Sequence, residues 1–275
     1  MKFDFELVGK IGSMALVNKA NRDIDYNIIA RISSELRPGM IWVTSGATEI
    51  GRLDYLKRNG HEIAEGDDDT QKADYSAQGQ SILMQNYRQF VDQRYSVRQL
   101  LVEHQHFNDA MKRENLKNML LRCPAQNAIP IVNYNDAVCY EENRRLEIMQ
   151  LTKAGGNVVQ CIDNDETASL IASLVKSRYL LLLTSVDGIY EDAHDESTLI
   201  KEISGKDVDE LLVNVDGYKK CCVGASRKGA NGAISKLEFI KEPIKNGTTV
   251  FIANAKYRIA DILSGVAPST CIKVK

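Results

Sequence analysis

The feature that most constrains the fold is a series of short apolar runs separated by longer amphipathic stretches. The runs are rich in leucine and β-branched residues and nearly continuous in apolar character, as expected for strands that are covered on both faces. We predict six strands, at Phe5–Lys10, Met40–Gly46, Arg98–His104, Ala128–Asp136, Tyr179–Ser185 and Thr248–Asn254. Because strands that alternate with helices build parallel sheets, the sequence predicts an α/β fold with a mostly parallel sheet sandwiched by helices.

Two of the intervening stretches carry apolar residues at helical spacing. They span residues 81–94 and 166–177, and each has one continuous apolar stripe. Asn164 or Asp165 is the expected N-cap of the second helix, because a short polar side chain can bond the free N–H groups of the first turn. The segment 143–160 is less regular, and we expect a hairpin or flap that turns at its two adjacent glycines.

The composition is that of an ordinary globular protein and excludes several classes. Of the 275 residues, 44% are hydrophobic and 26% are charged, and the net charge of -2 offers no excess for binding nucleic acid or an anionic membrane. No apolar run approaches the ~18 residues of a membrane span, and acidic residues interrupt the N-terminal segment, unlike in a signal peptide. The six cysteines form no C-x-x-C pair. We therefore expect reduced thiols and a cytoplasmic protein.

Glycine-bearing and charged segments follow the predicted strands. Ligands of open α/β sheets bind beyond the carboxyl ends of the strands. Lys10–Gly12 follows the first strand, and Ser45–Ala47 leads from the second into a helix whose free N–H groups can bind an anion. Asp163–Asp165 places two carboxylates and an amide at the start of another helix, and Gly229–Glu238 carries a further lysine, Lys236. Two lysines, glycine loops and an acidic cluster suit phosphoryl transfer, which needs cations and positioning around a highly charged group.

Each motif taken singly has a plainer explanation. Asp163–Asp165 could be no more than a helix cap, Asp136 could cap a turn, and the lysines could be solvated. His104 and His106 alternate at a strand end, but no carboxylate or cysteine pattern completes a metal shell around them. Trp42 lies in an apolar strand and is predicted to belong to the core. Neither the Walker A pattern nor a G-x-G-x-x-G after a strand is present, so the combination of motifs carries the kinase hypothesis.

The motifs resemble, in the same order, those of the amino acid kinase superfamily, and they are most similar to the glutamate 5-kinases. The resemblance covers the chain from about Lys10 to its C-terminus. The chain resembles the short form of these enzymes, which lacks a C-terminal RNA-binding-like domain. It rests on Lys10–Ser13, Ser45–Ala47, Ala77–Gln85, Ile129–Val138, Asp163–Asp165, Leu180–Tyr190, Gly229–Leu237 and Ala260–Ile272.

The resemblance implies a three-layer α/β/α sandwich in a single domain, residues 1–275, with an acceptor-binding part at roughly 1–165 and a nucleotide-binding part at roughly 166–275. It implies ATP-dependent phosphorylation of a carboxylate to an acyl phosphate, with Mg²⁺ as cofactor. The implied substrate is the γ-carboxylate of L-glutamate, and the product is glutamyl 5-phosphate, made in the first step of proline biosynthesis. The implied assembly is a homo-oligomer, a dimer or tetramer, with no nucleic acid and no membrane as partner.

The resemblance also implies roles for individual residues. Lys10 and Lys236 would be the two cations around the transferred phosphoryl group, and Asp165 would orient both lysines. The acceptor would be held by Ser45, Gly46, Ala47, Asp136 and Asn164. The nucleotide and its phosphates would be held by Gly12, Ser13, Thr184, Ser185, Asp187, Gly188, Tyr190, Gly229, Ala230, Asn231 and Gly232. No protein side chain is predicted as a metal ligand.

Five features depart from the glutamate 5-kinase pattern. Glu49 adds a carboxylate near the expected acceptor site, Tyr134 replaces a frequent glutamate, Ser185 replaces an aspartate, and Asn231 replaces a glycine. The connection from Cys139 to Ile162 is longer than is usual in the family. These departures leave three alternatives open: another amino acid as acceptor, a nucleoside monophosphate such as UMP or a phosphonate, or a non-catalytic sensor of nucleotide or amino acid.

Overall fold

The computed structural model divides the chain into two compact units. Unit 1 comprises Met1–Ile11, Gly39–Val43 and Asp165–Lys275, and unit 2 comprises Gly12–Pro38 and Thr44–Asn164. The structure describes residues 2–18, 21, 23–139, 141–153, 155, 158–161, 163–192, 194–221 and 232–275.

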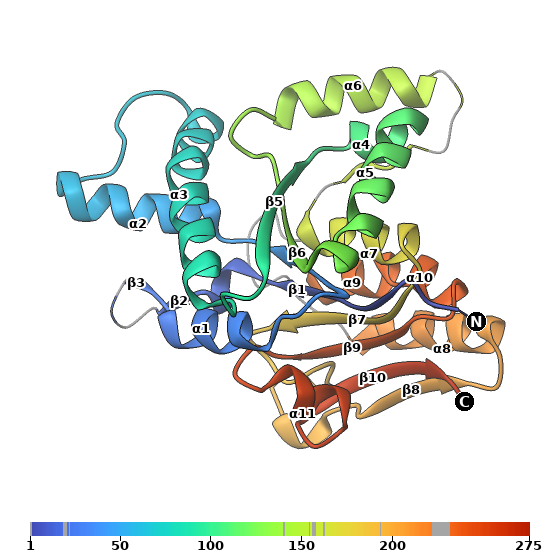
Figure 1. Ribbon diagram of the computed structural model, residues 1–275. Helices are drawn as coiled ribbons and strands as arrows, with labels where there is room; N and C mark the ends of the chain where they lie inside the picture. The colour runs from blue at the N-terminus through green and yellow to red at the C-terminus, as the bar shows by residue number, and fades with distance from the viewer. Residues whose placement is uncertain are drawn as a thin grey trace. The chain divides into compact units, whose positions relative to one another are not determined.

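Unit 1 is built on a mostly parallel sheet (Figure 1). Its strands follow the order β4 (Met40–Thr44, of which 40–43 belong to this unit), β1 (Phe5–Ile11), β7 (Ser177–Thr184), β9 (Thr249–Asn254), β10 (Ser269–Val274) and β8 (Glu202–Gly205). β7 pairs in parallel with both β1 and β9, whereas β10 runs antiparallel to β9 and parallel to β8. The run Leu180–Leu183 is buried, which explains why β7 has no polar alternation.

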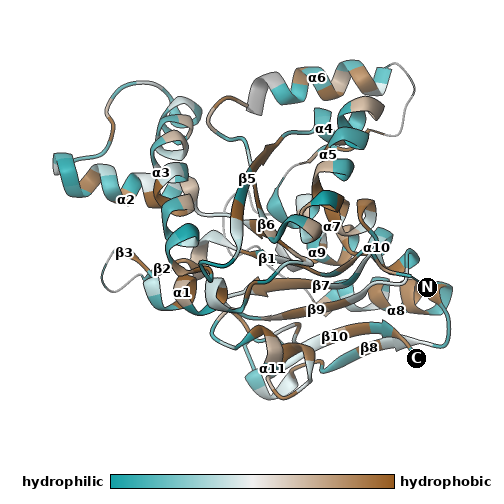
Figure 2. Cartoon of the chain, in the orientation of Figure 1, coloured by the Kyte–Doolittle hydropathy of each residue, from teal (hydrophilic) through white to brown (hydrophobic). Residues whose placement is uncertain are grey.

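Helices cover this sheet. They are α7 (Asn164–Leu174, which enters the unit at Asp165), α8 (Val208–Tyr218), α9 (Gly232–Phe239), α10 (Lys241–Lys245) and α11 (Ile259–Leu263), with short 3₁₀ turns at Glu196–Thr198 and Lys219–Cys221. α8 packs on β8 and β10, whereas α10 and α11 pack on β9. α8 begins after Asp207, whose carboxylate accepts from the N–H of Glu210. Figure 2 shows mostly apolar residues in β1, β7 and β9 and a mixture of apolar and polar residues on the helices.

Gly9 in β1 allows the strand to approach the core residue Trp42 closely. A Cβ atom added at Gly9 would lie 2.1 Å from Cζ3 of the indole ring. Trp42 is fully buried in β4, so its prediction as a core residue is confirmed. A glycine is therefore needed one residue before Lys10, because any side chain would displace the ring.

Unit 2 combines helices with a parallel pair of strands, β5 (Ser96–Val102) and β6 (Ala128–Tyr134). Its helices are α1 (Tyr26–Glu35), α2 (Ala47–Asn59), α3 (Asp68–Phe90), α4 (Gln105–Asn108), α5 (Ala110–Arg122) and α6 (Glu141–Lys153), with 3₁₀ turns at Ser13–Ala15 and Pro124–Gln126. A small antiparallel pair joins β2 (Val17–Asn18) to β3 (Asp23–Ile24). α2 packs along α3, and α1 also contacts α3 (Figure 1).

The six predicted strands are confirmed with ends shifted by a few residues, and the mostly parallel α/β class is confirmed. Two expectations were wrong, and one predicted helix is confirmed but starts earlier in the chain. The segment 143–160 is not a hairpin, because residues up to Lys153 belong to α6; its Gly156 lies outside the described residues. The helix predicted at 81–94 begins at Asp68, where the side chain of Asp67 accepts from the N–H of Thr70. α7 already begins at Asn164, so both Asn164 and Asp165 lie in its first turn and neither is the N-cap residue before it.

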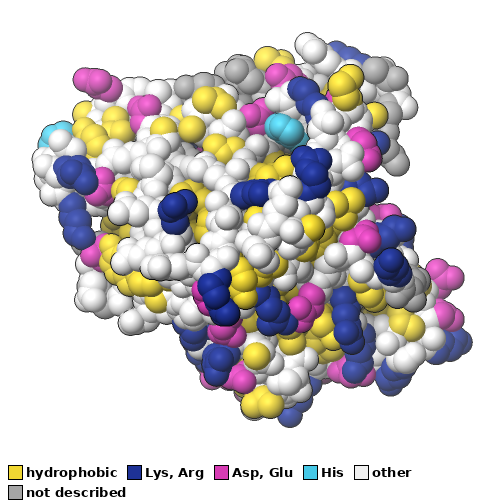
Figure 3. Space-filling model, viewed as in Figure 1, with side chains coloured by type: hydrophobic (Ala, Val, Ile, Leu, Met, Phe, Trp, Pro, Cys, Tyr) yellow, Lys and Arg dark blue, Asp and Glu magenta, His cyan; other side chains and the backbone are white. Residues whose placement is uncertain are grey.

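The surface carries no segregated charge on the face drawn in Figure 3. Lys and Arg side chains alternate there with Asp and Glu. Along the described ranges, no helix combines the length and apolar character needed to cross a membrane.

Candidate active site

A carboxylate with two lysines forms a buried polar cluster of unit 1. Nζ of Lys10 lies 2.7 Å from Oδ1 of Asp165, and Nζ of Lys236 lies 2.8 Å from Oδ2 of the same carboxylate. Lys10 and Asp165 are buried, whereas the Lys236 side chain retains 21% exposure. We call Lys10, Asp165 and Lys236 the lysine–carboxylate cluster. The sequence analysis named all three residues, and the structure brings them together.

Three distant elements position this cluster. Lys10 is the penultimate residue of β1, in register with Leu182 of β7, Asp165 lies in the first turn of α7, and Lys236 is carried by α9. Burial by itself raises the pKa of Asp165, but the charges of Lys10 and Lys236 outweigh it and hold that pKa below its ordinary value. The carboxylate is therefore ionised at neutral pH. The cluster then has one net positive charge and can attract a phosphate group.

A second polar cluster lies in unit 2 and consists of Ser45, Gln80, Asn133 and Asn164, here called the amide cluster. Nδ2 of Asn164 donates to Oγ of Ser45 and to Oδ1 of Asn133, each at 3.0 Å. Nδ2 of Asn133 donates to Oε1 of Gln80 at 2.8 Å. All three amide side chains are buried. Asn164 is the last residue of unit 2 and Asp165 continues unit 1, so one peptide bond links the two clusters in the chain.

The backbone beside Ser45 has the geometry expected of a strand-to-helix turn. Gly46 has φ 102°, a conformation that residues with a Cβ atom rarely adopt, and α2 begins directly after it at Ala47. The N–H of Ile50 bonds the carbonyl of Gly46, and the N–H groups of the preceding first turn point away from the helix. Gly46 and Ala47 thus present backbone donors next to the Ser45 hydroxyl.

Asp136 follows β6 in a turn. Desolvation raises the pKa of its carboxyl to about 6, and the charge of Arg144 opposes that rise. Asp136 has no hydrogen bond to any of the residues that the structure describes. A half-buried carboxyl without a donor is poised to receive a cationic partner.

The predicted nucleotide residues of unit 1 follow β7. The carbonyl of Thr184 accepts from the N–H of Ala255, and the Ser185 carbonyl accepts from Nδ2 of Asn254. Asp187 pairs with Lys256 at 3.0 Å and accepts from the hydroxyl of Tyr257. Lys256 also lies over the ring of Tyr257, 4.8 Å from its centroid. The sequence analysis did not single out Lys256, which lies two residues after the end of the predicted strand Thr248–Asn254.

The other predicted nucleotide residues lie in separate places. Gly188 is followed by Ile189, whose N–H donates to Oγ1 of Thr270, and Tyr190 bridges to Leu199. In unit 2, the carbonyl of Gly12 accepts from the N–H of Ala15, and the carbonyl of Ser13 accepts from the N–H of Leu16. Gly232 begins α9, whereas Gly229, Ala230 and Asn231 lie outside the described residues.

Two departures from the family pattern acquire local partners. Glu49 forms two hydrogen bonds with Arg52 on its own helix, at 2.7 and 3.1 Å, and Arg52 also pairs with Glu62 at 2.6 Å. The charge of Glu49 is therefore compensated within α2. Tyr134 is buried, its hydroxyl lies 3.0 Å from Sγ of Cys139, and burial raises its pKa.

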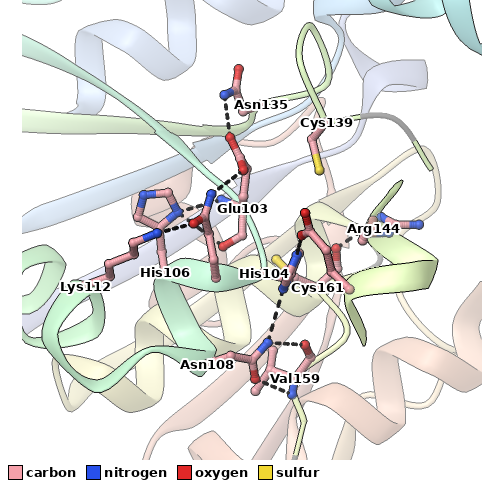
Figure 4. A network of polar contacts seen from close by, with 12 residues as sticks. Glu103, His104, His106, Asn108, Lys112, Asn135, Cys139, Arg144, Val159 and Cys161 are labelled. Carbon is pink, nitrogen blue, oxygen red and sulfur yellow. Dashed lines mark hydrogen bonds and ion pairs between the residues drawn. The ribbon is translucent and has the colours of Figure 1, made fainter. Parts of the chain in front are cut away.

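The long connection 139–162 is held by polar contacts with α4 and with His104, the residue before α4 (Figure 4). Nε2 of the buried His104 lies 2.6 Å from Oε2 of Glu147 on α6. The amide of Asn108 pairs with both backbone groups of Val159 at 2.8 Å, five residues before Asn164. His106 instead bonds the backbone of Glu103. His104 and His106 thus serve different contacts, and no group of three or more metal-binding side chains occurs within the described ranges.

The comparisons with known proteins agree with this architecture. The family model described as "Amino acid kinase family" matches residues 6–254. The chain belongs to the amino acid kinase family. This amino acid kinase is 30% identical over 260 residues to a glutamate 5-kinase of Streptococcus suis, covering 91% of this chain and 64% of the relative's length. It is 27% identical to a glutamate 5-kinase of Alkaliphilus metalliredigens, covering 96% of this chain and 94% of that relative.

Solved structures place the amino acid kinase among proteins of the same fold. A carbamate kinase from Giardia lamblia bound to AMP-PNP has a TM-score of 0.61 at 16% identity, with 98% of both chains covered. A structure from Aeropyrum pernix has a TM-score of 0.56 at 12% identity, covering 98% of this chain and 100% of that one. At these identities the likeness concerns the fold, and it confirms the predicted amino acid kinase fold with its α/β/α layers.

Proposed function

We propose that this protein is an ATP-dependent kinase that phosphorylates a carboxylate, with the γ-carboxylate of L-glutamate as acceptor. The observation that carries the proposal is the lysine–carboxylate cluster, in which one buried Asp165 orders two ammonium groups of distant elements. Similarity to glutamate 5-kinases over at least nine-tenths of the chain supports the choice of acceptor. The same similarity supports a role in proline biosynthesis and a homo-oligomer in the cytoplasm.

In the proposed reaction, a carboxylate oxygen of the acceptor attacks the γ-phosphorus of ATP, and the bond to the β–γ bridging oxygen breaks. The products are an acyl phosphate and ADP. Negative charge is spread over the transferred group, and Lys10 and Lys236 would stabilise it without a covalent step. Asp165 would keep both ammonium groups in place, so that little reorganisation is needed during transfer.

The two units would divide the binding of the substrates. Unit 1 carries Thr184–Tyr190, Gly232 and Lys256, which would hold the nucleotide, and unit 2 carries the amide cluster and Asp136, which would hold the acceptor. Mg²⁺ bound to ATP would neutralise phosphate charge. The described side chains contain no acidic group of three that fits a resident metal, so we assign Mg²⁺ no protein ligands and route no step through it.

The test is ATP turnover with a panel of acceptors in the presence of hydroxylamine, which traps an acyl phosphate as hydroxamate. We expect hydroxamate with glutamate. Phosphorylation of UMP or a phosphonate without hydroxamate would show that the acceptor is not a carboxylate. Hydroxamate formed with another amino acid alone would show that the acceptor is that amino acid and not glutamate. Nucleotide binding without turnover would favour a sensor.

Lys236→Ala tests the residue assignment. We expect turnover to fall by about 10³-fold or more, because a cation at the transferred group is lost. Lys245→Ala is the matched control, since Lys245 is a helical lysine of the same unit whose ion pair with Glu242 is exposed. Unchanged turnover in Lys236→Ala would remove the basis of the assignment.

A further inference from the structure

The amide cluster has a fixed hydrogen-bond direction. The backbone N–H of Tyr134 donates to Oδ1 of Asn133 at 2.8 Å. A backbone N–H can only donate, so the carbonyl oxygen of the Asn133 side chain must face it, and the NH₂ group must face the other way. This one bond sets the orientation of Asn133, which is 1% exposed and has no room to turn.

The orientation of the Asn133 amide also sets the orientation of the two amides that bond it, those of Gln80 and Asn164. Its NH₂ group donates to Gln80, so Gln80 must present its oxygen toward Asn133. Its oxygen accepts a second bond from Asn164, so Asn164 must present its NH₂ group there. The NH₂ group of Asn164 also donates to Ser45, so both hydrogens of this NH₂ group are used.

The remaining atom of Asn164 is a buried acceptor without a donor. No group among the residues that the structure describes bonds Oδ1 of Asn164, and the residue is only 9% exposed. A buried carbonyl oxygen left unpaired is unfavourable, so the site favours a ligand that brings an N–H group. The Ser45 hydroxyl accepts from Asn164 and is therefore free to donate its own hydrogen to an anion. An acceptor oxygen and a hydroxyl donor side by side fit the ammonium and carboxylate groups of an amino acid.

We propose that Gln80 of α3 is a positioning residue: together with Asn133 it holds Asn164 with its carbonyl oxygen toward the ammonium group of an α-amino acid acceptor. The inference rests on the proposed function, because it names what the acceptor must offer. Gln80 is buried at 8% exposure and lies 53 residues from Asn133 in the chain. Without the oxygen of Gln80, the NH₂ group of Asn133 loses its partner, and the orientation of Asn133 and Asn164 is no longer enforced.

The test compares Gln80→Met with Asn86→Met. Met is unbranched and similar in length. It removes the acceptor oxygen together with Nε2 of Gln80, which has no hydrogen-bond partner among the described residues. Asn86 is the matched control, because it lies buried on the same helix and, among the residues that the structure describes, its amide bonds only the carbonyl of Ile82. In Gln80→Met we expect the KM for the amino acid to rise about tenfold, with kcat and the KM for ATP within about twofold. Asn86→Met should leave the KM for the amino acid unchanged.

Gln80→Glu adds a rescue. Glu keeps an acceptor oxygen for the NH₂ group of Asn133 in both its ionised and its protonated form. Its KM for the amino acid should therefore stay closer to the wild-type value than the KM of Gln80→Met. An unchanged KM in Gln80→Met, or an equal rise in Asn86→Met, would overturn the inference while leaving the proposed function intact.

A measurement without turnover separates the two proposals. In protein labelled with ¹⁵N-asparagine, the side-chain NH₂ signal of Asn164 should shift and exchange faster in Gln80→Met than in Asn86→Met. If wild-type protein phosphorylates no amino acid, the proposed function fails, and this signal alone decides whether Gln80 orients Asn164. An unaltered Asn164 signal in Gln80→Met overturns the inference that Gln80 orients Asn164 through Asn133.

Discussion

Replacing Asp165 by Asn tests whether the lysine–carboxylate cluster is a buried ionic structure. Asn has the same shape, so the change removes one charge and leaves Lys10 and Lys236 facing each other. At an effective dielectric constant of about 20, each contact of 2.7 to 2.8 Å represents roughly 6 kcal/mol of gross attraction. The cost of desolvating the three groups offsets most of it. Removing one partner of a buried pair typically costs about 3–5 kcal/mol, and we expect that loss in the free energy of unfolding.

The assay is urea unfolding followed by the fluorescence of Trp42, which is the single tryptophan of the chain and is fully buried. Pyrophosphate should recover part of the loss, because an anion can take the place of the missing carboxylate between the lysines. The free energy of unfolding of the wild-type protein should rise less on addition of pyrophosphate.

Glu238→Gln is the matched control. Glu238 also bridges two lysines of unit 1, Lys219 and Lys241, but its side chain is 54% exposed. Surface pairs contribute little, so its loss should cost less than about 1 kcal/mol. Equal destabilisation by the two substitutions would refute the reasoning that burial sets the strength of the cluster.

Two further predictions concern packing and pH. Gly9→Ala should destabilise the protein by about 1–3 kcal/mol and alter the emission of Trp42, because the new Cβ atom overlaps the indole ring; unchanged emission and stability would contradict the close approach. Asp136 has a folded-state pKa of about 6, above the ~3.9 of an unfolded chain, so the folded state binds its proton more tightly. Stability should fall by about 2–3 kcal/mol as the pH rises from 4 through 6, and Asp136→Asn should lack this slope in unfolding measured across that range.

The predictable parts of the fold are those with a local cause. β1, β4, β6, β7 and β9 are buried on both faces, so their sequences are continuous apolar runs that need no knowledge of their neighbours. The strands β8 and β10 were missed. β8 spans only four residues and alternates between buried and more exposed positions, and β10 mixes polar residues with apolar ones, so neither forms an apolar run.

The helix α6 was also missed, because its described side chains are mostly exposed and form no apolar pattern. Among its described side chains, Leu146, Met149 and Leu151 are exposed, and no apolar stripe faces a core. Its position depends on Glu147 meeting His104, 43 residues away, and the return of the connection depends on Asn108 meeting Val159. Helical periodicity arises from burial, and a helix that is exposed nearly all round leaves no such periodicity in the sequence.

By itself, the sequence determined the α/β class, the strand ends that carry polar residues, and the identity of Lys10, Asp165 and Lys236 as candidate catalytic groups. Only the tertiary structure decided that one carboxylate contacts both lysines, and that Gln80 and Asn133 orient Asn164. Ser45 and Asn164 are 119 residues apart in the chain, and Asn133 and Gln80 are 53 apart. Hydrophobic periodicity is a property of neighbouring residues, whereas the direction of a hydrogen bond depends on which distant group the fold brings within 3 Å.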